Sequence, residues 1–111
     1  MAQTFCLLLD LKDDAQKIEK YITHHQDVWP EVLKSIKASG IVKMEIYHVA
    51  TRLVMFFEAT DDFSFEEKAR LDAFNPKVVA WEALMDEYQQ RLPFATKNEK
   101  WVRANKIFEV S

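Results

Sequence analysis

The chain has 111 residues, which is room for one domain (1–111), and 49% of them are apolar, enough for a packed core. Its net charge of -3 comes from 15 basic and 18 acidic residues scattered along the chain. No cluster of lysine and arginine resembles a phosphate-binding stripe, so we expect no nucleic-acid partner. The longest apolar runs are far shorter than the roughly 20 residues of a membrane span, so we expect no membrane partner.

The sequence also lacks the signals of secretion and of bound cofactors. The N-terminus has no basic region, apolar stretch or cleavage site of a signal peptide, and the lone cysteine, Cys6, cannot form an internal disulfide. A reducing cytoplasm is therefore the expected location. Because there is a single glycine, no nucleotide-binding fingerprint and no paired Cys/His spacing, we expect neither a cofactor nor a metal.

The first predicted element is a strand from residue 3 to residue 11. It is apolar on both faces, with Phe5, Leu7 and Leu9 on one side and Cys6 and Leu8 on the other. A strand of this kind needs cover on both faces of its sheet.

A helix is predicted next, opened by Asp13 and Asp14, whose carboxylates favour a helix N-terminus. Its apolar stripe runs as far as Ile36, but Pro30 interrupts it, which predicts a kink or a restart at Trp29-Pro30. Gly40 stands where a C-terminal cap is expected.

Two strands, 41–49 and 53–60, follow as a hairpin joined through residues 50–52. Ser64 and Glu67 form a capping box that begins a short helix, which ends near Asn75-Pro76.

Pro76 begins a further helix, which carries Trp81 and Tyr88 at helical spacing and ends at Leu92-Pro93. A last strand is predicted over 105–110. The order strand, helix, hairpin, helix, strand is that of an α+β, ferredoxin-like β-α-β-β-α-β sandwich.

Helices can cover only one face of such a sheet. The other face keeps apolar side chains whichever strand parity points outward, and the candidates are Phe5, Leu7, Met44, Ile46, Phe56 and Phe57. An exposed apolar face of this kind marks a partner or a ligand, so we expect a homodimer that packs sheet to sheet and encloses a cavity. A monomer with a modestly apolar sheet is the alternative.

The densest group of polar and aromatic residues lies between Tyr21 and Glu31. Residues four apart on a helix lie one above the other, so Tyr21, His25 and, if the helix continues, Trp29 share a face. A partly buried imidazole titrates near neutrality and can both donate and accept a proton. This face is therefore a candidate site for proton transfer on a small ring-shaped substrate.

Structural roles explain the same residues as well. The spacing of Tyr21 and His25 also arises by chance, and a histidine at a core edge is more often structural than catalytic. His24, about 100° around the helix, is expected to be solvated, and Trp81 taken alone fits core packing. Glu45 and Glu58 lie on neighbouring strands and could flank a pocket or face solvent.

A series of motifs spans nearly the whole chain: Tyr21-x3-His25-x3-Trp29-Pro30-Glu31, then Gly40, Ile46-Tyr47, Trp81-x3-Met85 and the terminal Phe108-Glu109-Val110. This series resembles the L-rhamnose mutarotase family, and its most specific part is His25-x3-Trp29-Pro30-Glu31. The resemblance implies a dimeric ferredoxin-like α/β barrel that interconverts the α and β anomers of a 6-deoxyhexose without a cofactor or a metal.

By position, the resemblance implies that His25 is the proton donor and that Tyr21 and Trp81 contact the sugar. Two of the family's sugar contacts differ: Glu82 stands in place of a second tryptophan, and Met44 in place of a tyrosine. Both changes spare the acid, which suggests the same chemistry on another sugar. The overall pattern is closest to the L-fucose branch of the family.

These observations together predict a His25-mediated opening and closure of the pyranose ring, with L-fucose as the substrate and L-rhamnose as the alternative. Two further alternatives stay open on the same fold, a cofactor-independent oxygenase and a ligand-binding module without catalysis.

Overall fold

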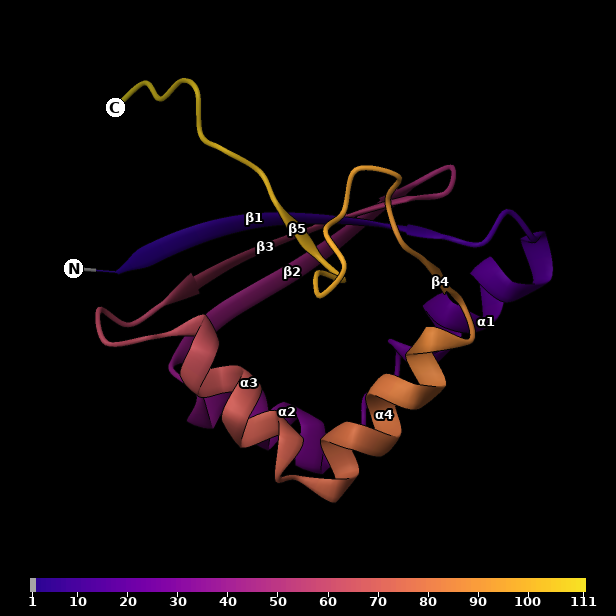
Figure 1. Cartoon of the computed structure of the whole chain (residues 1–111), viewed down its shortest axis with the longest axis horizontal. Helices are drawn as coiled ribbons and strands as arrows, with labels where there is room; N and C mark the ends of the chain where they lie inside the picture. Colours follow the sequence, from indigo (N-terminus) through magenta and orange to yellow (C-terminus); the bar gives the residue numbers. More distant parts are fainter. Residues whose placement is uncertain (1) are drawn as a thin grey trace.

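A computed structural model describes residues 2–111 of the chain. Its antiparallel sheet has the order β2-β3-β1-β4, and β5 pairs with β1 on the same side as β4 (Figure 1). The strands are β1 (Gln3–Leu11), β2 (Ile41–Val49), β3 (Arg52–Ala59), β4 (Gln89–Gln90) and β5 (Val102–Arg103). The predicted α+β ferredoxin-like arrangement is confirmed, with the last strand divided into the two short pieces β4 and β5.

The helices of residues 2–111 all lie on one side of the sheet (Figure 1). They are α1 (Ala15–His24), α2 (Pro30–Ala38), α3 (Phe65–Ala73) and α4 (Pro76–Asp86). The chain restarts a helix at Pro30, as its place in the sequence predicts, because proline is tolerated in a first turn and Trp29 becomes the residue before it. Helix α4 packs against both α2 and α3.

The side chains predicted to begin two of the helices accept hydrogen bonds from free backbone N–H groups in the first turn. The carboxylate of Asp14 accepts from Gln16 and Lys17 at the start of α1, and Ser64 Oγ accepts from the Glu67 N–H at the start of α3. Gly40, with φ +102°, ends α2 in the left-handed region. A Cβ there would lie 2.8 Å from Thr60 Oγ1, so a side chain would also crowd the neighbouring loop.

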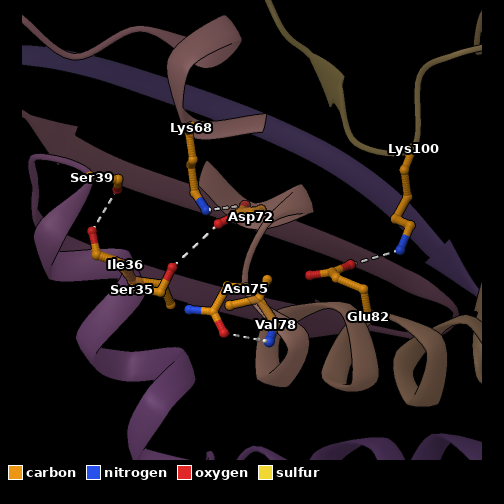
Figure 2. Close-up of polar contacts among 9 residues, drawn as sticks. All are labelled: Ser35, Ile36, Ser39, Lys68, Asp72, Asn75, Val78, Glu82 and Lys100. Atoms are coloured by element: carbon orange, nitrogen blue, oxygen red, sulfur yellow. Dashed lines mark hydrogen bonds and ion pairs between the residues drawn. The ribbon is translucent and has the colours of Figure 1, made fainter. Parts of the chain in front are cut away.

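Polar contacts join the helices to one another and to the C-terminal part of the chain (Figure 2). Ser35 Oγ on α2 donates to Asp72 Oδ1 on α3 at 3.3 Å, and Lys68 pairs with the same carboxylate. On α4, the carboxylate of Glu82 accepts a hydrogen bond at 2.8 Å from Lys100 Nζ, which lies in the segment before β5. These contacts fix α3 and the C-terminal segment relative to the helix layer.

The strand register decides which side chains face the helices. On β1 the odd positions Leu7, Leu9 and Leu11 are buried, and on β3 their neighbours Leu53 and Phe57 are buried with them. The even positions of β1 point to the open face. The alternation in β1 is therefore confirmed, although β1 is less buried on its open side.

Of the six candidates for that open face, Phe56 is the one found there. The other five, Phe5, Leu7, Met44, Ile46 and Phe57, lie on the helix side. The open face carries instead Cys6, Leu8, Val54, Tyr47 and Val49 beside Phe56. It remains substantially apolar, with Val49 67% and Phe56 37% exposed.

Two groups of aromatic side chains occupy the layer between sheet and helices. At the end marked by Leu11 and Leu53 lies the polar aromatic cluster, which we define as Tyr21, His24, His25, Trp29, Trp81 and Tyr88. At the other end lies the phenylalanine cluster, defined as Phe5, Phe57, Phe63 and Phe65. Trp101 packs against the hydrophobic core at both ends.

The C-terminal part of the chain departs from its prediction in two places. Helix α4 ends at Asp86, six residues before Leu92, and Tyr88 lies beyond it, where the chain enters β4. Residues 105–110 form no strand. The paired residues are Val102 and Arg103, and the Ala104 N–H still donates to the Cys6 carbonyl of β1, whereas the chain beyond them leaves the sheet on the side away from the helices (Figure 1).

Among residues 2–111, the structure contains no helix that is both long and apolar enough to span a membrane.

Candidate active site

The last turn of α1 positions the two residues that the spacing places together. Tyr21 is buried on the inner side of α1, and His25 is the residue that caps the helix, with its own N–H bonded to the carbonyls of Tyr21 and Ile22. Their ring centroids are 4.4 Å apart. The shared face of Tyr21 and His25 is therefore present, but α1 ends before Trp29 can join it by helical spacing.

The imidazole of His25 is fixed by a second contact to the same turn. His25 Nδ1 lies 2.9 Å from the carbonyl oxygen of Tyr21. A carbonyl only accepts hydrogen bonds, so Nδ1 carries the proton and Nε2 holds the lone pair when the ring is neutral. Burial lowers the pKa of His25 below its usual 6.5, against the opposing effects of the Tyr21 carbonyl and Glu82. The ring is therefore neutral at pH 7, with Nε2 able to accept a proton.

The phenol of Tyr21 stays protonated throughout the physiological range. Burial raises the pKa of Tyr21 to about 12, and the negative charge of Glu82 adds to this. Gln89 Nε2 donates to the phenol oxygen at 3.2 Å, which opposes the rise. Tyr21 is consequently a hydrogen-bond donor near His25 rather than an ionised base.

Trp81 lies beside both histidines on the buried side of α4. Its ring centroid is 5.6 Å from that of His25 and 5.2 Å from that of Trp29, with both pairs near edge-to-face. Trp29 thus reaches the same cluster through Trp81, from the start of α2 instead of from α1. The structure brings Tyr21, His25 and Trp81 together, the three residues that the family resemblance implies for the sugar site.

Glu82, the next residue on α4, is exposed and is engaged by Lys100. Lys100 Nζ lies 2.8 Å from Glu82 Oε2 and 2.7 Å from Asp86 Oδ1 (Figure 2 shows the Glu82 contact). Burial alone would lower the pKa of Lys100, but hydrogen bonds to Asp86 and Glu82 outweigh it and the pKa is raised. Glu82 therefore acts on Tyr21 and His25 through its charge, with its carboxylate held in an ion pair.

Met44 lies apart from these residues. It points to the helix side of β2, but it packs against the end of the core that holds Leu7, Phe57 and Phe63. The structure places it with the phenylalanine cluster, whereas Tyr21 and Trp81 belong to the other end.

Glu45 and Glu58 do not flank the candidate site. Their register pairs them with Phe56 and with Lys43, on the open face of the sheet. Glu45 accepts from Tyr47 Oη at 2.9 Å and forms an ion pair with Lys43 at 3.7 Å. Both carboxylates are therefore on the opposite side of the sheet from His25.

Three side chains near His25, those of His24, Tyr88 and Gln89, were not predicted as part of the site. His24, expected to be solvated, is half-buried, and its Nε2 lies 3.3 Å from the hydroxyl of Tyr88. Its ring also contacts Trp81. Gln89 is the third. No motif marks these positions, because Tyr88 and Gln89 reach α1 only through the turn after α4 and the pairing of β4 with β1.

A hollow of about 560 Å³ lies beside α1. It is lined by Gln16, Glu19, Lys20, Thr23, His24 and Tyr88. His24 and Tyr88 connect this hollow to the polar aromatic cluster, and His25 does not line it. Among the described residues, no three His, Cys, Asp or Glu side chains form a group suited to a metal ion.

The sequence of the chain is related to known mutarotases. The profile of the L-rhamnose mutarotase family matches residues 4–110. An L-fucose mutarotase of Xanthomonas campestris pv. campestris is 42% identical, over 98% of this chain and 89% of its own length. A UPF0734 protein of Dictyostelium discoideum is 34% identical, over 87% of this chain and 78% of its own.

Solved structures share the fold at low sequence identity. An L-rhamnose mutarotase from Formosa agariphila has a TM-score of 0.72 at 19% identity, covering 98% of this chain and 99% of its own. A tetracenomycin F2 cyclase from Streptomyces glaucescens has a TM-score of 0.64 at 14% identity, covering 98% and 97%. A dimeric ferredoxin-like protein from an uncultured marine organism reaches 0.63 at 14%, covering 100% and 99%.

The structural neighbours support the ferredoxin-like fold, and the profile match and the sequence relatives decide the family. The chain belongs to the L-rhamnose mutarotase family of isomerases.

Proposed function

We propose that this protein interconverts the α and β anomers of a 6-deoxyhexose, with L-fucose as its substrate. The observation that carries the proposal is His25: a neutral imidazole, fixed through Nδ1, beside the protonated phenol of Tyr21 and the indole of Trp81. Those groups suit proton transfer on a small polar ring, and the family supplies the reaction class.

In the proposed reaction, His25 Nε2 removes the proton of the anomeric hydroxyl while the bond between C1 and the ring oxygen breaks. The ring oxygen takes up a proton, which the imidazolium of His25 returns. The open aldehyde then rotates about its C1–C2 bond, and the reverse proton movements close the ring as the other anomer. The Tyr21 hydroxyl stabilises the developing charge on oxygen by hydrogen bonding. A positioned acid-base group of this kind contributes about 10²–10⁴-fold.

One sequence relative favours L-fucose over L-rhamnose as the substrate. The 42% identical protein of Xanthomonas campestris is named an L-fucose mutarotase, and its match covers nearly this whole chain.

Trp81 would offer an apolar face to the C–H side of the sugar.

Nuclear magnetic resonance tests this proposal directly. Saturation transfer between the anomeric protons of L-fucose, L-rhamnose and their epimers measures the exchange rate of each sugar with and without the protein. We expect the largest acceleration for L-fucose. A greater acceleration for L-rhamnose would contradict the choice of sugar, and binding without any acceleration would indicate a ligand-binding module or another enzyme on this fold.

We also propose that the protein forms a homodimer through the open face of its sheet. Phe56, Tyr47 and Val49 give this face an exposed apolar surface, which is typical of an interface. A structural neighbour is described as a dimeric ferredoxin-like protein.

Light scattering coupled to size-exclusion chromatography tests the dimer. Wild type is expected at twice the mass of one chain, and Phe56→Lys is expected to shift it to the monomer. Phe74→Lys is the control, because Phe74 is exposed at the end of α3, away from the sheet. A Phe56→Lys protein that stays dimeric would exclude this face as the interface.

A further inference from the structure

Gln89 occupies an unusual position between the sheet and α1. It is the first residue of β4, its backbone pairs with Leu11 of β1, and its side chain reaches the hydroxyl of Tyr21. The residue before it, Tyr88, contacts His24, so β4 brings two consecutive side chains to the polar aromatic cluster. Gln89 is thus held against α1 by the sheet pairing itself.

The amide of Gln89 is only half satisfied. Its Nε2 donates to Tyr21 Oη at 3.2 Å, whereas its Oε1 is buried and has no hydrogen-bond partner among the described residues. A buried acceptor without a donor costs free energy, so such groups are rare and require an explanation. One hydroxyl cannot satisfy both polar atoms of a planar amide, which leaves the second atom for another group.

The contact also leaves a donor at Tyr21. Because the phenol oxygen accepts the N–H of Gln89, its own hydrogen is directed elsewhere, and the raised pKa of Tyr21 keeps that hydrogen in place. An acceptor, Gln89 Oε1, and a donor, Tyr21 O–H, therefore lie side by side next to His25. A pair of this kind matches a sugar, whose hydroxyl groups both donate and accept and whose ring oxygen accepts.

We propose that Gln89 is a substrate-binding residue that selects for a sugar hydroxyl. Its Oε1 accepts a hydrogen bond from that hydroxyl, and its Nε2 holds Tyr21 so that the phenol donates to a neighbouring sugar oxygen. This inference rests on the proposed mutarotase function and extends it, because it names a residue that reads the substrate. A site built to hydrogen-bond a hydroxyl rejects analogues that lack it, since its buried polar group is then unpaired.

The matched pair Gln89→Met and Gln90→Met tests the contribution of this amide. Gln90 is the exposed neighbour on the same strand, so its replacement controls for changes in β4 itself. We expect Gln89→Met to lower kcat/KM for L-fucose by about 10- to 100-fold, mainly through a higher KM, as for the loss of a buried hydrogen bond. Its melting temperature should stay near that of wild type, because methionine removes the unpaired acceptor along with the donor. Gln90→Met should match wild type in both.

Monodeoxy analogues of L-fucose then identify the hydroxyl. In wild type, one analogue should lose about as much kcat/KM as Gln89→Met does with the full sugar. That analogue should lose little more in Gln89→Met, because the contact is already absent. The proposal is overturned if Gln89→Met keeps wild-type kcat/KM, or if every analogue loses as much in the variant as in wild type. A wild-type protein that accelerates no sugar at all overturns the mutarotase function, and the substrate role of Gln89 with it.

Discussion

The two aromatic clusters of the core lie at opposite ends of the same sheet and differ in chemistry. The phenylalanine cluster has four rings without a polar atom, packed with centroids 4.8–5.9 Å apart. The polar aromatic cluster contains rings with nitrogen or oxygen, and it adjoins Gln89, whose Oε1 lacks a partner. The first arrangement only gains from burial, whereas the second keeps polar groups that burial penalises.

This difference separates the part of the core that stabilises the fold from the part that we expect to react. Polar groups held in a dry core are a cost that a purely structural cluster avoids. Their retention beside the end of α1 is consistent with a site that meets a polar ligand.

The largest expected effect concerns His25. We expect His25→Ala to reduce the acceleration of L-fucose anomer exchange by about 10²–10⁴-fold, because the proton-transferring group is lost. His24→Ala is the matched variant, since His24 shares the cluster but bonds to Tyr88 instead. Saturation-transfer NMR measures both, with circular dichroism to check the fold. If His25→Ala kept the activity and His24→Ala lost it, His24 would be the proton-transferring residue and the assignment of His25 would be wrong.

At the other cluster, stability should change and chemistry should not. Phe57 is 2% exposed and contacts the other three phenylalanines. Phe57→Ala is expected to lower the free energy of unfolding by about 3–5 kcal/mol, through lost burial and a residual cavity. Urea unfolding gives this value, and the exposed Phe74→Ala should change it little. A folded Phe57→Ala protein with lost exchange activity would contradict the separation of the two clusters.

Acid should lower the stability of the folded protein through the titration of His25 in the polar aromatic cluster. The pKa of His25 is lower in the folded protein than in the unfolded chain, because burial disfavours the charged ring. The unfolded chain therefore binds the extra proton first, so this contribution to stability is complete above pH 6.5 and declines as pH falls from there through the folded pKa.

Thermal unfolding between pH 8 and pH 5 measures this linkage. His25→Gln should show a smaller loss of stability with acid than wild type does, since glutamine does not titrate. Equal losses in the two proteins would mean that His25 is not the group responsible.

The smallest expected effect is at the ion pair between Lys100 and α4. Lys100→Met should cost at most about 1 kcal/mol of stability, since Glu82 and Asp86 are half-exposed. It should also raise the pKa of His25, because Glu82 would then act on the ring without a paired cation. The acid limb of the pH–rate profile reports this shift, with Lys97→Met as control. An unchanged limb would show that the Glu82 charge does not reach the imidazole.

The sequence determined much of this protein through local rules. Pro30, Ser64, Pro76 and Gly40 mark ends of helices because their backbone or capping chemistry acts within a single turn. The pairing of Tyr21 with His25 follows in the same way from the helical repeat. The grouping of the β1 side chains into two faces was readable too, since alternate residues face opposite sides of a strand, but the sequence did not show which face meets the helices.

Only the tertiary structure decided what depends on distant segments meeting. Tyr88 and Gln89 reach α1 because β4 pairs with the end of β1, and Glu82 is engaged because Lys100 returns beside α4. The prediction of a strand over 105–110 was wrong. A strand needs a neighbouring strand for its backbone hydrogen bonds, and the chain there has already left the sheet. Helical turns carry their own hydrogen bonds, whereas sheet pairing and ion pairs depend on partners far along the chain.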